Sequence, residues 1–154
     1  MLCVHILSVA FLFSSSLCHE NKIIVSYPLA TEQKEFLMRS VAVFLADSGF
    51  EVTVLSSDHS SYLNHPNIIN HVLDLSESKS YSSKCTWELH FMMDCSILNY
   101  LSACTRKFWN HPIVKDIYGT RDDYDALIIP SSFGRFSAPL AYNSSIRLVM
   151  AYRH

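Results

Sequence analysis

The feature that most constrains the fold is a strand, helix and strand pattern at residues 22–56. Residues 23–27 and 51–55 are short runs rich in β-branched side chains, which is typical of strands, and Pro28 ends the first run. Apolar side chains between them recur at the spacing that lines one face of a helix: Leu37, Val41, Phe44 and Leu45. Gly49 follows, where a left-handed helix cap is favoured. Strands joined by a helical crossover are almost always parallel and share one sheet, so this pattern predicts an α/β domain.

The expected elements continue along the chain. They are a strand at 68–75, a long helix over 89–108, a short helix at 112–119, a strand at 126–129, a helix at 136–142 and a strand at 146–152. The run at 126–129 is apolar throughout, as expected of a central parallel strand covered on both faces. The sequence therefore predicts an α/β fold, a parallel sheet with helices on both faces. Ligands bind at the carboxyl ends of such strands, which directs attention to the loop at 28–34.

The first eighteen residues have the pattern of a secretory signal peptide. They contain no Asp, Glu, Lys or Arg, and an apolar run at 2–13 is followed by three serines. This predicts a signal peptide at 1–18 and one domain at 19–154 in the endoplasmic reticulum lumen or outside the cell. A buried first strand or helix is the alternative. No run approaches the ~20 apolar residues of a spanning helix, so we expect no transmembrane anchor in this chain.

Charge and cysteine content narrow the classes of function. A formal charge of −2 gives no reason to expect nucleic acid as a partner. Without Cys3 and Cys18 the cysteines are odd in number and form no CxxC pair, so neither a disulfide framework nor a metal site is indicated. Asn143 begins an N-glycosylation sequon, Asn-Ser-Ser, which matters only if the chain enters the secretory pathway.

Several stretches carry a family resemblance. KIIVSYPLATEQKEFLMRSVAVFLADSGFEVTVL at 22–55 resembles the opening of the UDP-glycosyltransferases, the glucosyl- and glucuronosyltransferases of animals. LADSGFEVTVL at 45–55 is the most specific part. The leader, NHP at 110–112 and DDYDALIIP at 122–130 fit the same family. The resemblance covers essentially the whole chain after the leader.

The resemblance implies a Rossmann-like fold. Family members have two such domains facing each other across a cleft, the GT-B arrangement, and the front domain binds a small lipophilic acceptor while the rear one binds a UDP-sugar. This chain resembles the front domain alone. We therefore expect a fragment or truncated member without a cofactor of its own, inactive alone. Its three glycines, Gly49, Gly119 and Gly134, form no glycine-rich loop for the pyrophosphate of a UDP-sugar, which agrees.

The resemblance also implies where a catalytic pair would lie. In the family, a histidine in the loop after the first strand takes the proton of the acceptor, and an aspartate at the end of a later strand orients that histidine. The gapless register with the family puts Lys34 at the histidine position and Pro130 at the aspartate position. Both roles are therefore vacant.

No other residue fills these roles in the sequence. A lysine must lose its proton to act as a base, and Glu32 and Glu35 favour its charged form, so we interpret Lys34 as a solvated loop lysine. Pro130 has no side chain that could orient a partner. The other histidines after the leader region are interpreted as surface residues on polar loops or helix edges: His59, His65, His71, His90 and His111.

Aromatic side chains are candidates for an acceptor pocket. The set is Trp87, Phe91, Phe108 and Trp109. Lys34, Trp87 and Phe91 are the acceptor-binding candidates, although aromatics at helical spacing are more often core. A second hypothesis is a non-catalytic module, either a secreted lipophile carrier or a subunit that pairs with a complete transferase. An unrelated hydrolase or nucleotide-binding domain is disfavoured, because the sequence has no G-x-S-x-G elbow or phosphate loop.

Overall fold

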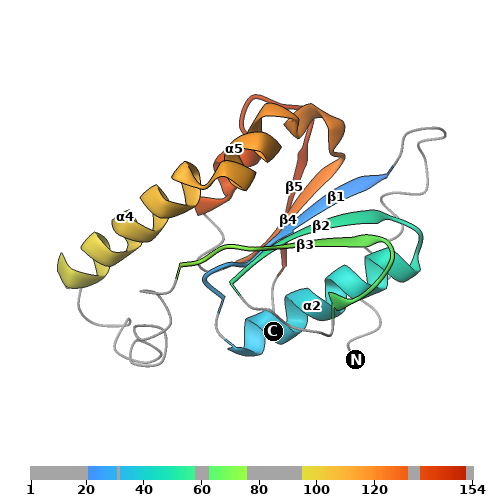
Figure 1. Cartoon of the computed structure of the whole chain (residues 1–154), viewed down its shortest axis with the longest axis horizontal. Coiled ribbons are helices and arrows are strands. Elements are labelled where there is room, and N and C mark those ends of the chain that lie inside the picture. Colours follow the sequence, from blue (N-terminus) through green and yellow to red (C-terminus); the bar gives the residue numbers. More distant parts are fainter. Residues whose placement is uncertain (1–20, 31, 58–62, 76–94, 132–135, 152–154) are drawn as a thin grey trace.

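A computed structural model describes residues 21–30, 32–57, 63–75, 95–131 and 136–151 (Figure 1). Five parallel strands form one sheet in the order β3-β2-β1-β4-β5. The elements are β1 (Lys22–Ser26), α2 (Glu32–Asp47), β2 (Glu51–Ser56), β3 (Ile68–Val72), α4 (Cys95–Asn110), α5 (Pro112–Gly119), the 3₁₀ turn η4 (Arg121–Asp123), β4 (Ala126–Pro130), the 3₁₀ turn η6 (Ala138–Ala141) and β5 (Arg147–Ala151). This is the predicted α/β Rossmann-like architecture.

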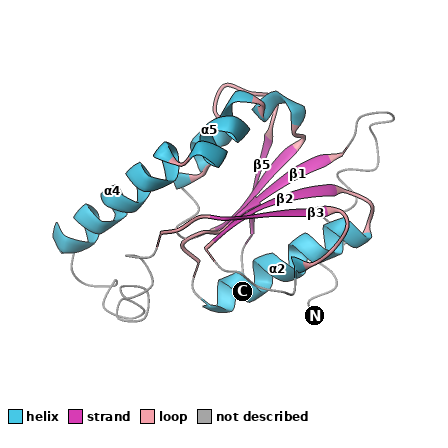
Figure 2. Ribbon diagram, in the orientation of Figure 1, coloured by secondary structure: helices cyan, strands magenta, loops and turns pink. Residues whose placement is uncertain are grey.

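The helices cover both faces of the sheet. Figure 1 shows α2 below the strands and α4 and α5 above them, and Figure 2 shows the same layers by type of element. Strand β4 is apolar throughout, and all five of its residues are buried, as predicted for a central strand covered on both faces. The core is accordingly divided into two clusters, one between the sheet and α2 and one between the sheet and α5.

The face that α2 buries differs from the predicted one. Its buried residues are Met38, Ala42, Leu45 and Ala46. Of the predicted stripe, Leu45 is buried, whereas Leu37, Val41 and Phe44 are only partly covered. Small side chains at Ala42 and Ala46 let the helix backbone approach the sheet closely, so the larger side chains flank the contact. The helical period was therefore right, and the centre of the buried face was wrong.

The C-terminus of α2 is capped at Gly49, as predicted from the sequence. Gly49 has a φ of 92°, in the left-handed region where a Cβ is costly. The amide of Gly49 donates to the carbonyl of Ala46 (3.0 Å), and that of Phe50 donates to the carbonyl of Leu45 (3.1 Å). These two bonds form a Schellman motif and satisfy two of the last helical carbonyls.

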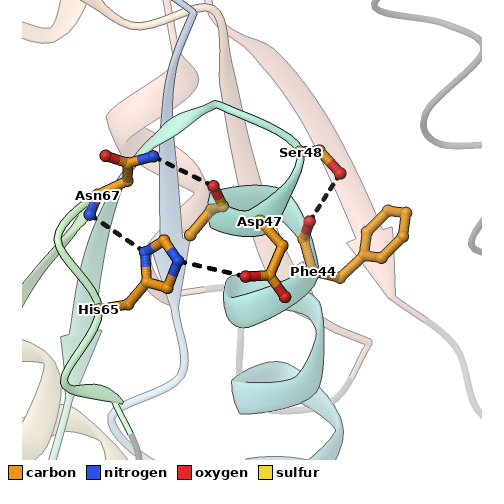
Figure 3. Close-up of polar contacts among 6 residues, drawn as sticks. Phe44, Asp47, Ser48, His65 and Asn67 are labelled. Carbon is orange, nitrogen blue, oxygen red and sulfur yellow. Dashed lines mark hydrogen bonds and ion pairs between the residues drawn. The ribbon is translucent and has the colours of Figure 1, made fainter.

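Polar contacts join this helix end to the segment before β3 (Figure 3). His65 Nε2 lies 3.2 Å from Asp47 Oδ1, and His65 Nδ1 accepts a hydrogen bond from the backbone amide of Asn67 (3.1 Å). The side-chain amide of Asn67 donates to the carbonyl of Ala46 (3.2 Å). His65 therefore links the C-terminal end of α2 to the segment before β3, which is a structural role.

Above the sheet, the chain turns at Pro112, the first residue of α5, where the missing amide hydrogen costs nothing. Val114 and Ile117 are buried, as the apolar side of this helix predicted. The helix expected at 136–142 is instead the single 3₁₀ turn η6, which ends at Ala141 because Tyr142 has an extended backbone. Strand β3 ends at Val72, earlier than the expected 75.

In the described part of the chain, no helix combines the length and the hydropathy needed to cross a bilayer. The predicted signal peptide at 1–18 lies outside the described residues.

Candidate functional site

The candidate site is the carboxyl edge of the sheet between β1 and β4. These two strands are hydrogen-bonded neighbours, although α2, β2, β3, α4 and α5 separate them in the chain. The strand order reverses direction here, and open α/β sheets bind ligands at such a switch point. The edge is built by the loop that follows Ser26 and, beyond β4, by Ser131 and Ser137.

The loop after β1 is held against its neighbour strand. The amide of Tyr27 donates to the carbonyl of Leu55 in β2 (2.9 Å), and the amide of Ala30 donates back to the carbonyl of Tyr27 (3.1 Å). Pro28 is buried, whereas Leu29 and Ala30 are half-buried. The loop therefore turns within a few residues and offers mainly apolar surface at the edge.

Two buried hydroxyl groups form a hydrogen bond beneath this edge of the sheet. Ser26 Oγ and Ser137 Oγ are 2.8 Å apart, and both residues are wholly buried. Each hydroxyl satisfies the other, so the cost of burying them is offset by the hydrogen bond. This bond connects β1 directly to the segment that returns after β4.

Aromatic contacts hold that returning segment in place. Trp109 Nε1 donates to the carbonyl of Phe136 (3.2 Å). The rings of Phe108 and Phe136 meet edge to face, with centroids 5.1 Å apart, and Phe108 meets Trp109 in the same way at 5.5 Å. Phe108 is fully buried and Trp109 half-buried. These two candidate aromatics are therefore packing residues that support the edge.

Lys34 lies in the first turn of α2, immediately beyond the loop after β1. It is half-buried and lies in a helix, so its placement in a loop was wrong. A cation in the first turn opposes the helix dipole, which favours the neighbouring acids Glu32 and Glu35 instead. Glu35 is bound to Arg39 one turn on, with 2.7 Å between carboxylate and guanidinium.

Pro130 is the last residue of β4 and is buried. It is aligned with Ala151 of β5, and the amide of Ser131 donates to the carbonyl of Ala151 (3.0 Å). The fold therefore brings Lys34 and Pro130 to the same edge of the sheet, on the two segments that flank the switch point.

The remaining predicted site residues lie elsewhere. Trp87 and Phe91 are outside the described residues. Asn143 is exposed, in the turn between η6 and β5, at the opposite edge from Lys34 and Pro130. Among the described residues, no group of three or more histidines, cysteines or carboxylates is arranged to hold a metal ion.

A hollow of about 220 Å³ lies over β2 and β3 on the side of α5, away from this edge. Its lining includes Thr53, Ile69, His71, Asp116, Asp123 and Tyr124. Burial lowers the pKa of His71 below its usual 6.5, and His111 acts in the same direction, whereas Asp116 opposes them.

Sequence reasoning missed two of these arrangements. It placed His71 and His111 on loops or helix edges at the surface, but His71 lies in β3 and both are half-buried. The alternation of Ile69 and His71 in the expected strand was a signal that the histidine faces the same side as buried Thr53 and Leu55. Ser26, the one polar residue in its apolar run, was a similar signal for the hydroxyl pair.

No protein-family model matches this chain, and no curated protein sequence matches it.

Proposed function

We propose that this chain is a Rossmann-like acceptor-binding domain of the UDP-glycosyltransferase kind, which enters the secretory pathway and binds a small lipophilic alcohol or phenol at the carboxyl edge between β1 and β4. The observation that carries the proposal is the pairing of these two strands. It brings together the two segments on which the resemblance puts a catalytic pair, and the loop after β1 offers mainly apolar surface at that edge.

The same edge supports binding without sugar transfer. The full sequence has three glycines, too widely spaced to form a glycine-rich phosphate-binding loop. The resemblance puts Lys34, in the first turn of α2, and Pro130, at the end of β4, at the places of the general base and its orienting acid. General-base catalysis is typically worth ~10²–10⁴-fold, so its loss removes most of the rate. Pairing with a complete transferase, which would supply the chemistry, is the second form of this proposal.

Titration of the isotope-labelled chain by nuclear magnetic resonance tests the proposal. With 1-naphthol as the probe, we expect saturable shifts of the backbone amides of Leu29, Ala30, Lys34 and Ser131. The amide of Gly49, at the opposite edge, is the internal control. UDP-glucose at the same concentrations should leave all these signals in place, because the chain has no phosphate loop.

A matched pair of variants sharpens the test. Lys34→Trp puts a bulky ring on the first turn of α2 and should weaken naphthol binding by tenfold or more. Lys115→Trp makes the same change at an exposed site on α5 and should leave binding unchanged. Shifts confined to His71 and Tyr124, with Lys34→Trp indistinguishable from the parent, would place the ligand in the hollow over β2 and β3 and refute the proposal.

A further inference from the structure

The hollow over β2 and β3 lies toward the amino edge of the sheet, whereas the proposed ligand edge is at the carboxyl ends of β1 and β4. Lys22 and Glu51, which line the hollow, are the first residues of β1 and β2, and Tyr124 precedes β4. Helix α5 contributes Asp116 and Ile117 to the lining. The volume of about 220 Å³ is below the ~300–1,000 Å³ of pockets for drug-sized ligands, so the hollow can hold one small molecule.

The most buried part of the lining is a hydroxyl beside an apolar side chain. Thr53 is 3% exposed and Ile117 is 4% exposed. Thr53 Oγ1 lies 3.5 Å from the hydroxyl of Tyr124, which is longer than the ~2.5–3.0 Å of an ordinary hydrogen bond between hydroxyls. No described residue gives the Thr53 hydroxyl a closer hydrogen-bond partner. Because a buried hydroxyl is unfavourable without such a partner, a polar ligand group that reaches it gains a favourable contact.

The uncompensated charges of the lining are negative. Lys22 Nζ lies 3.8 Å from Glu51 Oε2, so these two charges offset each other. The carboxylates of Asp116 and Asp123 form no ion pair with any residue that the structure describes. Burial is the main cause that lowers the pKa of His71, so this side chain adds little positive charge at neutral pH. The hollow therefore favours a cationic ligand over an anionic one.

The remaining lining suits an apolar body on that ligand. Ile69 is aligned with Thr53 in the sheet and is 47% exposed, although its neighbour in the register is buried. Ile113 and Tyr124 are half-buried at the same hollow. Covering these side chains removes apolar surface from water, and an aromatic ring such as that of Tyr124 also attracts a nearby cation.

We propose that the hollow binds a small organic amine in its ammonium form. The nitrogen is directed toward the carboxylates of Asp116 and Asp123 and the hydroxyl of Thr53, and the apolar body lies against Ile69 and Tyr124. An ammonium group has donors for all three of these acceptors. An anionic ligand would meet the two carboxylates, and a purely apolar one would leave the Thr53 hydroxyl without a partner. This site goes beyond the proposed function, because it lies away from the acceptor edge and selects a different head group.

Titration of the isotope-labelled chain with three ligands that share one ring tests the head group. The ligands are 2-phenylethylamine, 2-phenylethanol and phenylacetate, which are cationic, neutral and anionic at neutral pH. With the amine we expect saturable shifts of the backbone amides of Ile69, His71 and Tyr124. With phenylacetate these amides should not shift. The alcohol belongs to the class proposed for the edge between β1 and β4 and should shift Leu29 and Ala30 instead.

Charge variants test the position of the ammonium group. Asp116→Asn should weaken binding of 2-phenylethylamine about two- to fivefold, the range expected for a partly exposed ion pair, and adding Asp123→Asn should weaken it further. Asp122→Asn is the matched control, because it removes the same charge from an exposed neighbour that does not line the hollow. It should leave the affinity unchanged. Equal weakening by Asp122→Asn and Asp116→Asn would show a general attraction to negative charge and overturn the site.

A second pair of variants tests the buried hydroxyl. Thr53→Val keeps the shape of the side chain and removes the hydroxyl, so it should weaken binding of the amine, whereas Thr53→Ser keeps the hydroxyl and should bind like the parent. The amide spectrum of each variant shows that the fold is retained.

The two ligand sites fail in different ways. Absence of amine shifts at Ile69, His71 and Tyr124, or equal shifts with phenylacetate, would overturn the amine site. If 2-phenylethanol leaves Leu29 and Ala30 unshifted while the amine still shifts the hollow, the result supports the amine site and counts against the proposed function.

Discussion

Strands β4 and β5 lie side by side, and at one register position both carry a leucine. Leu127 of β4 is fully buried, whereas its partner Leu148 of β5 is 44% exposed. All five residues of β4 are buried, and none of the five in β5 is. Both runs are largely apolar, so their composition does not explain the difference. The difference is explained by the number of covered sides, because β4 has a strand on each flank and helices on each face.

The largest expected effect comes from truncating the two aligned leucines. Leu127→Ala should lower the free energy of unfolding by about 2–5 kcal/mol, because it leaves a cavity in a packed layer. Leu148→Ala should cost less than about 1 kcal/mol, since much of that side chain is already in water. Urea unfolding of the two variants measures both values. Equal losses would mean that β5 is covered in solution and would remove the contrast between the strands.

A smaller effect should follow from the hydroxyl pair at the ligand edge. Ser26→Ala leaves the hydroxyl of Ser137 buried without its partner, and the reverse holds for Ser137→Ala, so each should cost about 1–3 kcal/mol. The double variant should cost less than the sum, because it removes both groups together. Ser48→Ala, at an exposed hydroxyl, is the control. Additive losses in the double-mutant cycle would show that the two hydroxyls do not depend on each other.

The smallest effect concerns the other edge strand and is a dependence on pH. Because burial lowers the pKa of His71 in the folded chain, the unfolded chain binds more protons as the pH falls below 6.5. Stability should therefore be fully present above pH 6.5 and decline as the pH falls toward the folded pKa. His71 faces His111 and Asp116 of α5 and shares its hollow with Lys22, Glu51 and Asp123.

Thermal unfolding of the parent and of His71→Gln across pH 5 to 8 measures this effect. The stability of His71→Gln should fall less below pH 6.5 than that of the parent. His65→Gln, which removes the histidine that contacts Asp47 of α2, is the comparison. A parent and His71→Gln with identical profiles would mean that His71 is as hydrated in the fold as in the unfolded chain.

The fold could be predicted from sequence where local and long-range preferences agree. Three predictions matched the structure: the helical period of α2, the glycine that ends it and the buried strand β4. The glycine is required by the left-handed backbone at the helix end, and the apolar run is required by burial of the strand on both faces. The contact face of α2 was missed because side-chain size does not show how closely a helix approaches its sheet. Ala42 and Ala46 lie at that contact where larger residues were expected.

The candidate site was predictable in part. Its place after β1 followed from the βαβ pattern alone, because parallel strands present their carboxyl ends at one edge. Its other half, at Pro130 and Ser137, required knowing that β4 is the strand next to β1. The hollow containing His71 and Asp116 was not predictable, since β3 and α5 are brought together by the crossover between distant segments.

By itself, the sequence determined the number and kind of its main elements, the parallel direction of the first strands and the position of the sequon, because spacing, glycine and proline act through the local backbone. Only the tertiary structure decided which strands are central, which leucine of an aligned pair is in water and which hydroxyls meet at the ligand edge. The physical reason is that burial and buried hydrogen bonds belong to pairs of surfaces, and no segment of the chain specifies its neighbour alone.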